Sequence, residues 1–191
     1  MDYSLIRTFV ATPVPNAVFG LQDQLRSVIS EKFGRIEWIK NDRLHLTLKF
    51  VGDTPESSFK PIQDVLESIS KNTETIELKI EGTGCFPKKE RPRVLWSGIT
   101  GEISKLENLY NEIQSSLESL GFFKDDKPFH PHITLGRSKY PQKRTPDIAS
   151  FLAKSYDPIS FRVEKIQFIT SELFPNGPVY TILSTHFFEN N

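Results

Sequence analysis

Two short segments of the chain share the same alternation of hydrophobic and polar positions. In residues 43–51 and 131–137, aliphatic side chains occupy every second position. Because successive side chains of a β-strand point to opposite faces, this alternation predicts a strand with one buried face in each segment. The other face of each strand then carries a histidine and a threonine two residues apart: His45 and Thr47 in the first segment, His132 and Thr134 in the second.

Strict alternation also predicts the faces of the residues that follow the first motif. It places Lys49 on the same polar face as His45 and Thr47. It places Phe50 on the buried face, together with the leucines. The polar face of this strand is therefore expected to carry a cation beside the histidine and the threonine.

Hydrophobic periodicity predicts the remaining helices and strands. Helical spacing occurs in residues 16–33, 59–69 and 103–120, and a further helix is expected to begin at Thr145 and Pro146. Strands are expected in residues 4–12, 75–82, 93–99, 159–170 and 178–187. The order helix, His-x-Thr strand, helix, strand, strand occurs twice, with an offset near the 87 residues that separate the two histidines.

This recurrence indicates an internal duplication. We expect a single domain over residues 1–191, made of two similar lobes at approximately 1–100 and 101–191. Each lobe would contribute one His-x-Thr motif to a shared cleft. Since no low-complexity linker separates the halves, the lobes are expected to pack as one unit.

Composition narrows the class of protein. Hydrophobic residues make up 37% and charged residues 25% of the chain, which is typical of a globular protein. Lys+Arg and Asp+Glu both number 24, so no overall positive charge favours bulk nucleic-acid binding. The single cysteine, Cys85, excludes an internal disulfide and favours the reducing cytoplasm. Neither a signal peptide nor an apolar run of about 18 residues is found, so no membrane association is expected.

Two imidazoles and two hydroxyls around one small space suit in-line chemistry at a phosphate diester. One neutral imidazole can take a proton from water, and one imidazolium can give a proton to the departing sugar oxygen. Histidine titrates near about 6.5, so both forms exist near neutral pH. The threonine hydroxyls can donate hydrogen bonds to the phosphoryl oxygens as charge develops there. The residues alone leave open which histidine is the acid and which the base.

The histidines also admit other interpretations. A single histidine on a strand is more often structural, but the recurrence of the motif in matching elements favours a shared function. His130 is expected at the strand entrance, with a third active-site group as the alternative, and His186 is expected to be a strand or edge residue. No metal or cofactor is expected, because His-x-x-x-His, Cys-x-x-Cys, Gly-x-Ser-x-Gly and phosphate-loop motifs are absent from the sequence.

Two basic clusters accompany the second motif and the segment before it. Residues 137–146 contain Arg137, Lys139, Lys143 and Arg144 without an acid, and a predicted loop contains Lys88, Lys89, Arg91 and Arg93. Such clusters are either solvated surface loops or local contacts for a nucleic acid. Arg137 lies three residues beyond Thr134, at the strand end, and is a candidate phosphate ligand.

The chain resembles the two-histidine (2H) phosphoesterases, and within them the RNA 2',3'-cyclic phosphodiesterases of the ThpR/LigT type. The resemblance covers nearly the whole chain and rests on "RTFVA", "RLHLTLKFVGD", "FPKKERPRVLWSGI", "FHPHITLGRS" and "ITSELFPNGPVY". It implies a bilobal α+β fold in which two antiparallel sheets line a central cleft and the helices lie outside. Gly136 is a minor departure, since a small alanine is common there in relatives.

The resemblance also implies an activity, which is hydrolysis of a 2',3'-cyclic phosphate RNA end to a 2'-phosphate without a cofactor. His45 would be the proton donor to the leaving 3' oxygen and His132 the proton acceptor that acts on water. Thr47, Thr134 and Arg137 would hold the phosphate. The expected partners are RNA 3' ends or nucleoside 2',3'-cyclic phosphates, bound by a cytoplasmic monomer. The alternatives are a non-catalytic nucleotide or RNA-end binding module, and a 2'-5' RNA ligase or 2'-5' phosphodiesterase of the same fold.

Overall fold

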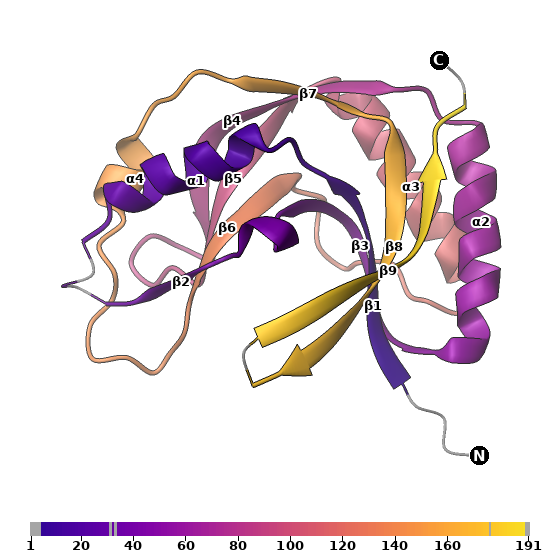
Figure 1. The fold of residues 1–191 in the computed structure, drawn as a ribbon, viewed down its shortest axis with the longest axis horizontal. Helices are drawn as coiled ribbons and strands as arrows, with labels where there is room; N and C mark the ends of the chain where they lie inside the picture. Colours follow the sequence, from indigo (N-terminus) through magenta and orange to yellow (C-terminus); the bar gives the residue numbers. More distant parts are fainter. Residues whose placement is uncertain (1–4, 31, 33, 176, 190–191) are drawn as a thin grey trace.

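The computed structural model describes residues 5–30, 32, 34–175 and 177–189, and these form one curled sheet with helices along its outer side (Figure 1). The helices are α1 (Ala17–Ser27), α2 (Phe59–Lys71), α3 (Ile103–Glu118) and α4 (Ala149–Ala153), with short 3-10 turns at Asn41–Arg43 and Glu56–Ser58. The strands are β1 (Leu5–Pro13), β2 (Ile36–Trp38), β3 (His45–Pro55), β4 (Ile76–Phe86), β5 (Val94–Gly101), β6 (His132–Ser138), β7 (Ile159–Val163), β8 (Lys165–Phe174) and β9 (Gly177–Phe187).

The strand order is β7-β4-β5-β6-β3-β1-β8-β9, with β2 paired to β6, and every pair is antiparallel. The predicted α+β class is therefore confirmed. The two expected sheets are continuous with each other, because β3 and β6 meet at the pair Leu46 and Ile133. The two strands that carry the His-x-Thr motifs thus form the centre of the sheet.

The elements of the two chain halves are interleaved in space. One half of the sheet contains β3, β1, β8 and β9, and the other contains β6, β5, β4 and β7. Figure 1 shows α2 and α3 beside the first half, and α1 and α4 beside the second. Gln22 on α1 donates hydrogen bonds to the carbonyls of Leu135 and Ile39, both at 2.9 Å. The division of the chain into lobes at 1–100 and 101–191 stays a prediction.

Some element boundaries differ from those predicted. The helix expected over residues 16–33 ends at Ser27, and the helix expected from Thr145 is only Ala149–Ala153. The strand expected over 159–170 is two strands, because β7 pairs with β4 at one edge and β8 pairs with β1 near the other. A pattern of alternation cannot show that its two ends pair with different neighbours. The three-residue strand β2 was not predicted, because it is too short for a periodic signal.

The aliphatic positions of both motif strands form the centre of the core, as predicted. Leu46, Leu48, Ile133 and Leu135 are at most 1% exposed. Complete burial of one such side chain stabilises the folded state by roughly 1.5–3 kcal/mol. This burial fixes the orientation of both strands, so their histidines and threonines point away from the core.

A β-bulge in β3 overturns the predicted face of Lys49. Strand β1 pairs Ala11 with Thr47 and then Val10 with Lys49, so Leu48 is the extra residue. Lys49 consequently lies on the buried face, where it is 1% exposed. Its ammonium group donates to Gln114 Oε1 at 2.6 Å and to the Phe123 carbonyl at 2.8 Å. The prediction from strict alternation was wrong beyond Leu48, because it assumes a strand without bulges.

Candidate functional site

The single pair between β3 and β6 brings the two motifs together. Leu46 and Ile133 are antiparallel partners and both point into the core. Continuing this register by one residue in each direction places His45 opposite Thr134 and Thr47 opposite His132. We call this surface of the sheet the site face, defined by His45, Thr47, His132 and Thr134, all of which are half-buried.

Both catalytic candidates have the same hydrogen bond at one ring nitrogen. Nδ1 of His45 lies 2.8 Å from the Arg43 carbonyl oxygen, and Nδ1 of His132 lies 2.6 Å from the His130 carbonyl oxygen. A carbonyl can only accept, so each Nδ1 carries the proton and donates it. In the neutral ring, Nε2 then has a free lone pair. Each imidazole is thereby oriented and keeps one nitrogen for proton transfer.

Aromatic rings surround each histidine. The His45 ring stacks on Phe9 with a centroid distance of 4.9 Å, and the edge contact with Tyr180 is at 5.7 Å. The His132 ring has an edge contact with Phe86 at 5.1 Å, and Trp96 lies at 6.1 Å. These rings remove water from one side of each imidazole. Their place beside the histidines was not predicted, although Phe9 and Trp96 lie in strands that were.

Burial shapes the acid–base properties of both histidines. The pKa of His45 is lowered to about 4, mainly because the ring is buried; the charges of Arg137 and His132 act in the same direction, and the bond to the Arg43 carbonyl opposes them. Burial likewise lowers the pKa of His132, against the hydrogen bond to the His130 carbonyl. Both imidazoles are therefore mainly neutral at pH 7 in the free protein. An anion bound between them would raise both pKa values, because it stabilises the imidazolium.

A second β-bulge, in β6, brings Arg137 onto the site face. Strand β5 pairs Trp96 with Thr134, Leu95 with Gly136 and Val94 with Arg137, so Leu135 is the extra residue. Arg137 therefore lies on the same face as Thr134, although three residues separate them. Its charge lowers the pKa values of both motif histidines. The predicted candidate phosphate ligand thus lies near both imidazoles.

The bulges in β3 and β6 lie at equivalent positions in the two motif strands, but they bring different residues onto the site face. Three residues beyond Thr47, β3 carries Phe50, which lies beside Phe9 at a ring distance of 6.3 Å and is 61% exposed. Three residues beyond Thr134, β6 carries the exposed Arg137. Beyond the two motifs, the site face therefore carries a cation on β6 and an exposed aromatic ring on β3. Phe50 was expected on the buried face, and the β3 bulge corrects that prediction too.

The two threonine hydroxyls are free to bind a ligand. Across the described ranges, neither the Thr47 nor the Thr134 hydroxyl has a hydrogen bond within the protein. Both residues are half-buried, and each lies across from one of the histidines. Two hydroxyl donors, two imidazoles and one guanidinium therefore share this face, a set that can bind and protonate an oxyanion.

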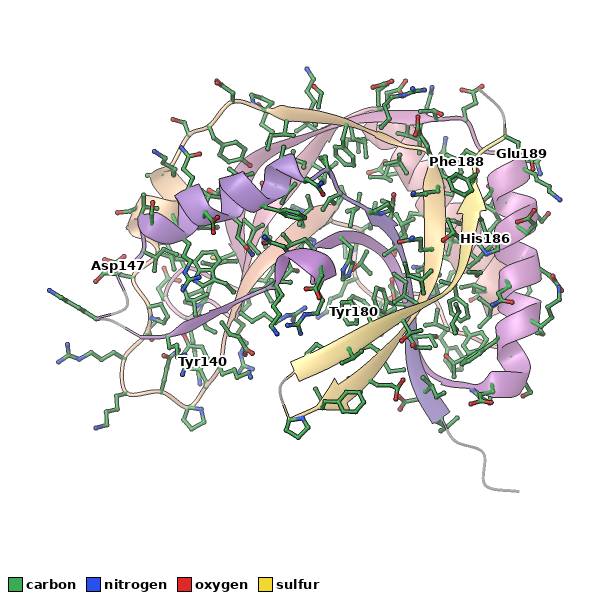
Figure 2. All side chains as sticks on the ribbon, viewed as in Figure 1. Tyr140, Asp147, Tyr180, His186, Phe188 and Glu189 are labelled. Atoms are coloured by element: carbon green, nitrogen blue, oxygen red, sulfur yellow. The ribbon has the colours of Figure 1, made fainter. Side chains whose placement is uncertain are left out.

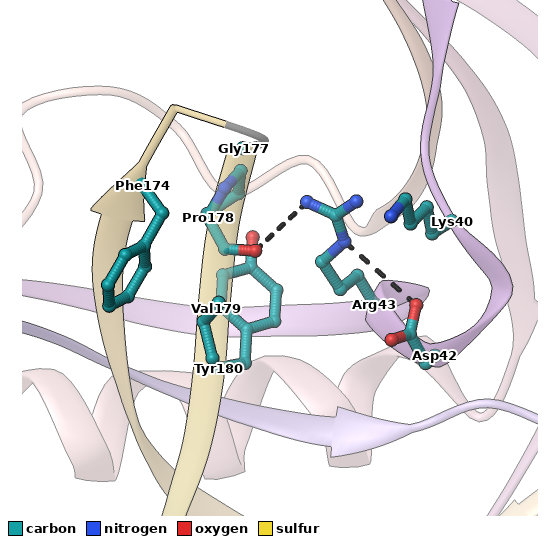
Figure 3. Close-up of a pocket in the computed structure, with 8 residues that line it drawn as sticks. All are labelled: Lys40, Asp42, Arg43, Phe174, Gly177, Pro178, Val179 and Tyr180. Carbon is teal, nitrogen blue, oxygen red and sulfur yellow. Dashed lines mark hydrogen bonds and ion pairs between the residues drawn. The ribbon is translucent and has the colours of Figure 1, made fainter.

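A cavity of about 390 Å³ is lined by Tyr180 and Arg43 (Figure 3), both of which also contact His45. Lys40 and the 3-10 turn with Asp42 and Arg43 form one wall, and the β8–β9 hairpin with Tyr180 forms the other. Arg43 donates to the Pro178 carbonyl at 3.0 Å and so connects the two walls. The sequence offered no signal for Arg43, whose backbone carbonyl also orients His45.

The other two histidines have different surroundings. His130 is exposed and its ring packs edge-on against Trp96 at 4.8 Å, at the entrance to β6. His186 is buried in β9, as expected for a strand residue, and its ring nitrogens bond to Glu67 at 2.8 Å and Ser184 at 2.9 Å. Figure 2 shows His186 beside α2, toward the opposite end of β9 from Tyr180. His186 thus links β9 to α2.

Within the described residues, no group of three or more His, Cys, Asp or Glu side chains is arranged to hold a metal ion. A mechanism without a metal or another cofactor stays a prediction. Among the same residues, no helix is long and apolar enough to cross a membrane.

Comparisons with known proteins identify relatives that match nearly the whole chain. A family model described as the 2'-5' RNA ligase superfamily matches residues 15–173. The chain is 31% identical over 183 residues to the RNA 2',3'-cyclic phosphodiesterase of Aquifex aeolicus (strain VF5), covering 94% of this chain and 95% of that protein. It is 31% identical over 180 residues to the protein of the same name from Thermotoga maritima, with 93% of each chain covered.

Solved structures show the same architecture. A crystal structure of a Thermus thermophilus protein superposes with a TM-score of 0.81 at 28% identity, covering 97% of this chain and 99% of the other. The crystal structure of Escherichia coli LigT complexed with 3'-AMP gives a TM-score of 0.75 at 24% identity, with the same coverage. The second likeness concerns the fold alone.

Proposed function

Because the chain belongs to the 2'-5' RNA ligase superfamily, we propose that it hydrolyses RNA 2',3'-cyclic phosphate ends to 2'-phosphate ends. Relatives that carry the name RNA 2',3'-cyclic phosphodiesterase cover most of the chain at about the same length. The observation that carries the proposal is the pair of His-x-Thr strands joined at Leu46 and Ile133, with Nε2 of each histidine left for proton transfer. Such a pair supplies one base and one acid to the same phosphorus.

The reaction requires one bond to form and one to break at phosphorus. His132 accepts a proton from water as the water oxygen attacks, and His45 donates a proton to the 3' oxygen as the P–O3' bond breaks. The products are a 2'-phosphate and a free 3' hydroxyl. The resemblance supplies this assignment of roles, and the shared geometry of the two rings accommodates it. Each proton transfer contributes roughly 10²–10⁴ in rate.

Thr47, Thr134 and Arg137 are proposed to bind the phosphoryl oxygens. The hydroxyls donate from opposite sides, and the guanidinium balances the negative charge that develops during attack. Arg137 also adds, after burial, to the lowered pKa values of both histidines before the substrate binds. The substrate anion then allows one imidazole to become protonated, so the acid is formed in the complex.

The direct test is incubation of the purified protein with an oligonucleotide that ends in a 2',3'-cyclic phosphate, in buffer with EDTA. We expect conversion to the 2'-phosphate at the same rate with and without the chelator, followed by mass spectrometry. Absence of turnover together with tight binding of a 2'-phosphate nucleotide by calorimetry would instead identify a binding module. Loss of turnover in EDTA, restored by a divalent cation, would overturn the metal-free mechanism.

The pH dependence of turnover should differ between free enzyme and complex. The profile of kcat/KM reports the free protein, in which both histidine pKa values are lowered, so its maximum is expected below about pH 6.5. The profile of kcat reports the complex, whose bound anion raises the pKa values, so its maximum is expected at higher pH. Arg137→Gln removes a positive charge and should move the kcat/KM profile to higher pH. Coincident maxima above pH 7 would contradict this account.

We also propose that the protein acts in the cytoplasm as a monomer. The single cysteine supports a reducing compartment. The proposed site supports a monomer, because one chain supplies both histidines, both threonines and Arg137.

A further inference from the structure

Two basic segments that are distant in the sequence lie against each other at the β6 end of the site face. We call them together the basic surface, defined as residues Lys88–Arg93 and Lys139–Arg144. The Arg91 and Arg93 guanidiniums lie 4.9 and 5.9 Å from the centre of the Tyr140 ring. In addition, the Ser138 amide donates to the Arg93 carbonyl at 3.0 Å. The fold therefore merges the two basic clusters of the sequence into one surface.

This surface has a local excess of positive charge. Its cations are Lys88, Lys89, Arg91, Arg93, Lys139, Lys143 and Arg144, and its only acid is Glu90, whereas the whole chain has 24 residues of each sign. Among the described residues, Lys139 is the one member of the set with an ion pair, to Glu37 at 2.6 Å. The other six cations are exposed and keep their charge available for a polyanion.

Tyr140 gives part of this surface a defined shape. Its ring holds two guanidiniums by cation–π contacts, so their planes are oriented before any ligand binds. A guanidinium that is already ordered loses less conformational entropy when it binds a phosphate. Arg91 and Arg93 therefore differ from solvated surface arginines.

The basic surface is continuous with the proposed site. Arg93 directly precedes Val94, which is the strand partner of Arg137. A cavity of about 370 Å³ lined by Arg35, Glu37, Arg137, Lys139 and Gln142 extends from Arg137 toward the same surface. In Figure 2, Tyr140 lies at this end of the molecule, across from Tyr180 of the β8–β9 hairpin. A chain held at the histidines can thus continue past Arg137 onto Tyr140 and its arginines.

We propose that the basic surface binds the backbone phosphates of the single-stranded RNA segment that precedes the cyclic phosphate end. This inference rests on the proposed function and adds the path of the RNA beyond its last nucleotide. A basic track with an aromatic side chain matches the usual way in which proteins hold single strands. A nucleoside 2',3'-cyclic phosphate has no preceding phosphate and cannot reach this surface.

The test compares a short and a long substrate with one double variant. Arg91→Ala/Arg93→Ala should raise KM for a decamer with a cyclic phosphate end on the order of tenfold, and leave kcat/KM for a nucleoside 2',3'-cyclic phosphate unchanged. The slope of log KM against log salt for the decamer should fall by about 0.7 for each phosphate that the variant no longer binds. The control, Lys60→Ala/Lys71→Ala, removes two exposed charges from α2 and should alter neither substrate.

The outcomes separate this inference from the proposed function. If the unmodified protein turns over neither substrate, the proposed function fails. If it turns over both, but the arginine variant and the α2 variant have the same decamer KM, the basic surface does not bind RNA. An equal loss for both substrates would place the arginines in the catalytic site and also overturn the inference. Should the variant fail to fold, the unmodified protein decides: a decamer KM no more salt-dependent than that of the nucleoside cyclic phosphate refutes the proposal.

Discussion

Replacement of His132 or His45 by alanine is expected to lower kcat for a cyclic phosphate substrate by roughly 10²–10⁴. Each variant removes one of the two groups that transfer protons, while Thr47, Thr134 and Arg137 still bind the phosphate. KM should therefore change far less than kcat. Single-turnover kinetics with a nucleoside 2',3'-cyclic phosphate would measure the chemical step directly.

The double variant and a neighbouring histidine serve as controls for this prediction. Because the two imidazoles act on one reaction, His45→Ala/His132→Ala should lose about as much as either single variant rather than the product of both losses. His130→Ala keeps the backbone carbonyl that orients His132, so its kcat should stay within about tenfold of the unmodified protein. A loss of kcat in His130→Ala as large as that in His132→Ala would contradict this prediction and place His130 among the groups that transfer protons.

The sequence was sufficient to predict the motif strands, because their burial has a simple period. Leu46 and Ile133 are buried at the positions that alternation requires, and the opposite face carries the histidines and threonines. The recurrence of the motif at a fixed offset then suggested that the two strands meet. Both inferences depend on local order, which a single sequence contains.

The bulges could not be predicted, and they decide which side chains complete the site. A bulge shifts the period by one residue, so Lys49 moves into the core and Phe50 out of it. The same shift in β6 brings Arg137 onto the site face. No residue type marks Leu48 or Leu135 as the extra position, since both are buried leucines like those around them. The partner strand determines the bulge, and its register is a property of the folded chain.

The pairing of the outer strands also lies beyond sequence periodicity. Strand β4 belongs to the first half of the chain but pairs with β5 on the β6 side, and β8 pairs with β1 on the β3 side. Such exchange is determined by long-range packing, for example by Gln22 of α1 on the Leu135 carbonyl of β6. The hydrophobic periodicity of the helices and strands in each half of the chain is the same whether or not the halves exchange strands.

The duplicated site is symmetric in its motif but asymmetric in its surroundings. His45 contacts Phe9 and Tyr180, with Phe50 beyond, whereas His132 contacts Phe86 and Trp96 and shares its strand with Arg137. An apolar environment disfavours the imidazolium, and so does a nearby cation, but only the apolar environment excludes water from the ring. Aromatic rings lie beside both histidines, so the assignment of His132 as the base comes from the resemblance.

Thr47→Val and Thr134→Val are each expected to lower kcat by roughly 10²–10³, the usual effect of removing one donor from an oxyanion site. Valine has nearly the same shape as threonine and favours strands, so the change removes the hydroxyl and leaves β3 and β6 intact. Because neither hydroxyl bonds to another described residue, no hydrogen bond within that part of the protein is lost. The measurement is steady-state kinetics with a nucleoside 2',3'-cyclic phosphate, beside thermal unfolding of each variant.

Two further substitutions show whether the hydroxyl itself is responsible. Thr47→Ser and Thr134→Ser keep the donor and should retain most of the activity, while Thr181→Val changes an exposed threonine of β9 and should retain all of it. If both valine variants were as active as the unmodified protein, the phosphoryl oxygens would have to be held by Arg137 and the backbone alone. Unequal losses would identify which hydroxyl faces the oxygen that gains most charge, since a donor acts in proportion to the charge that develops at its partner.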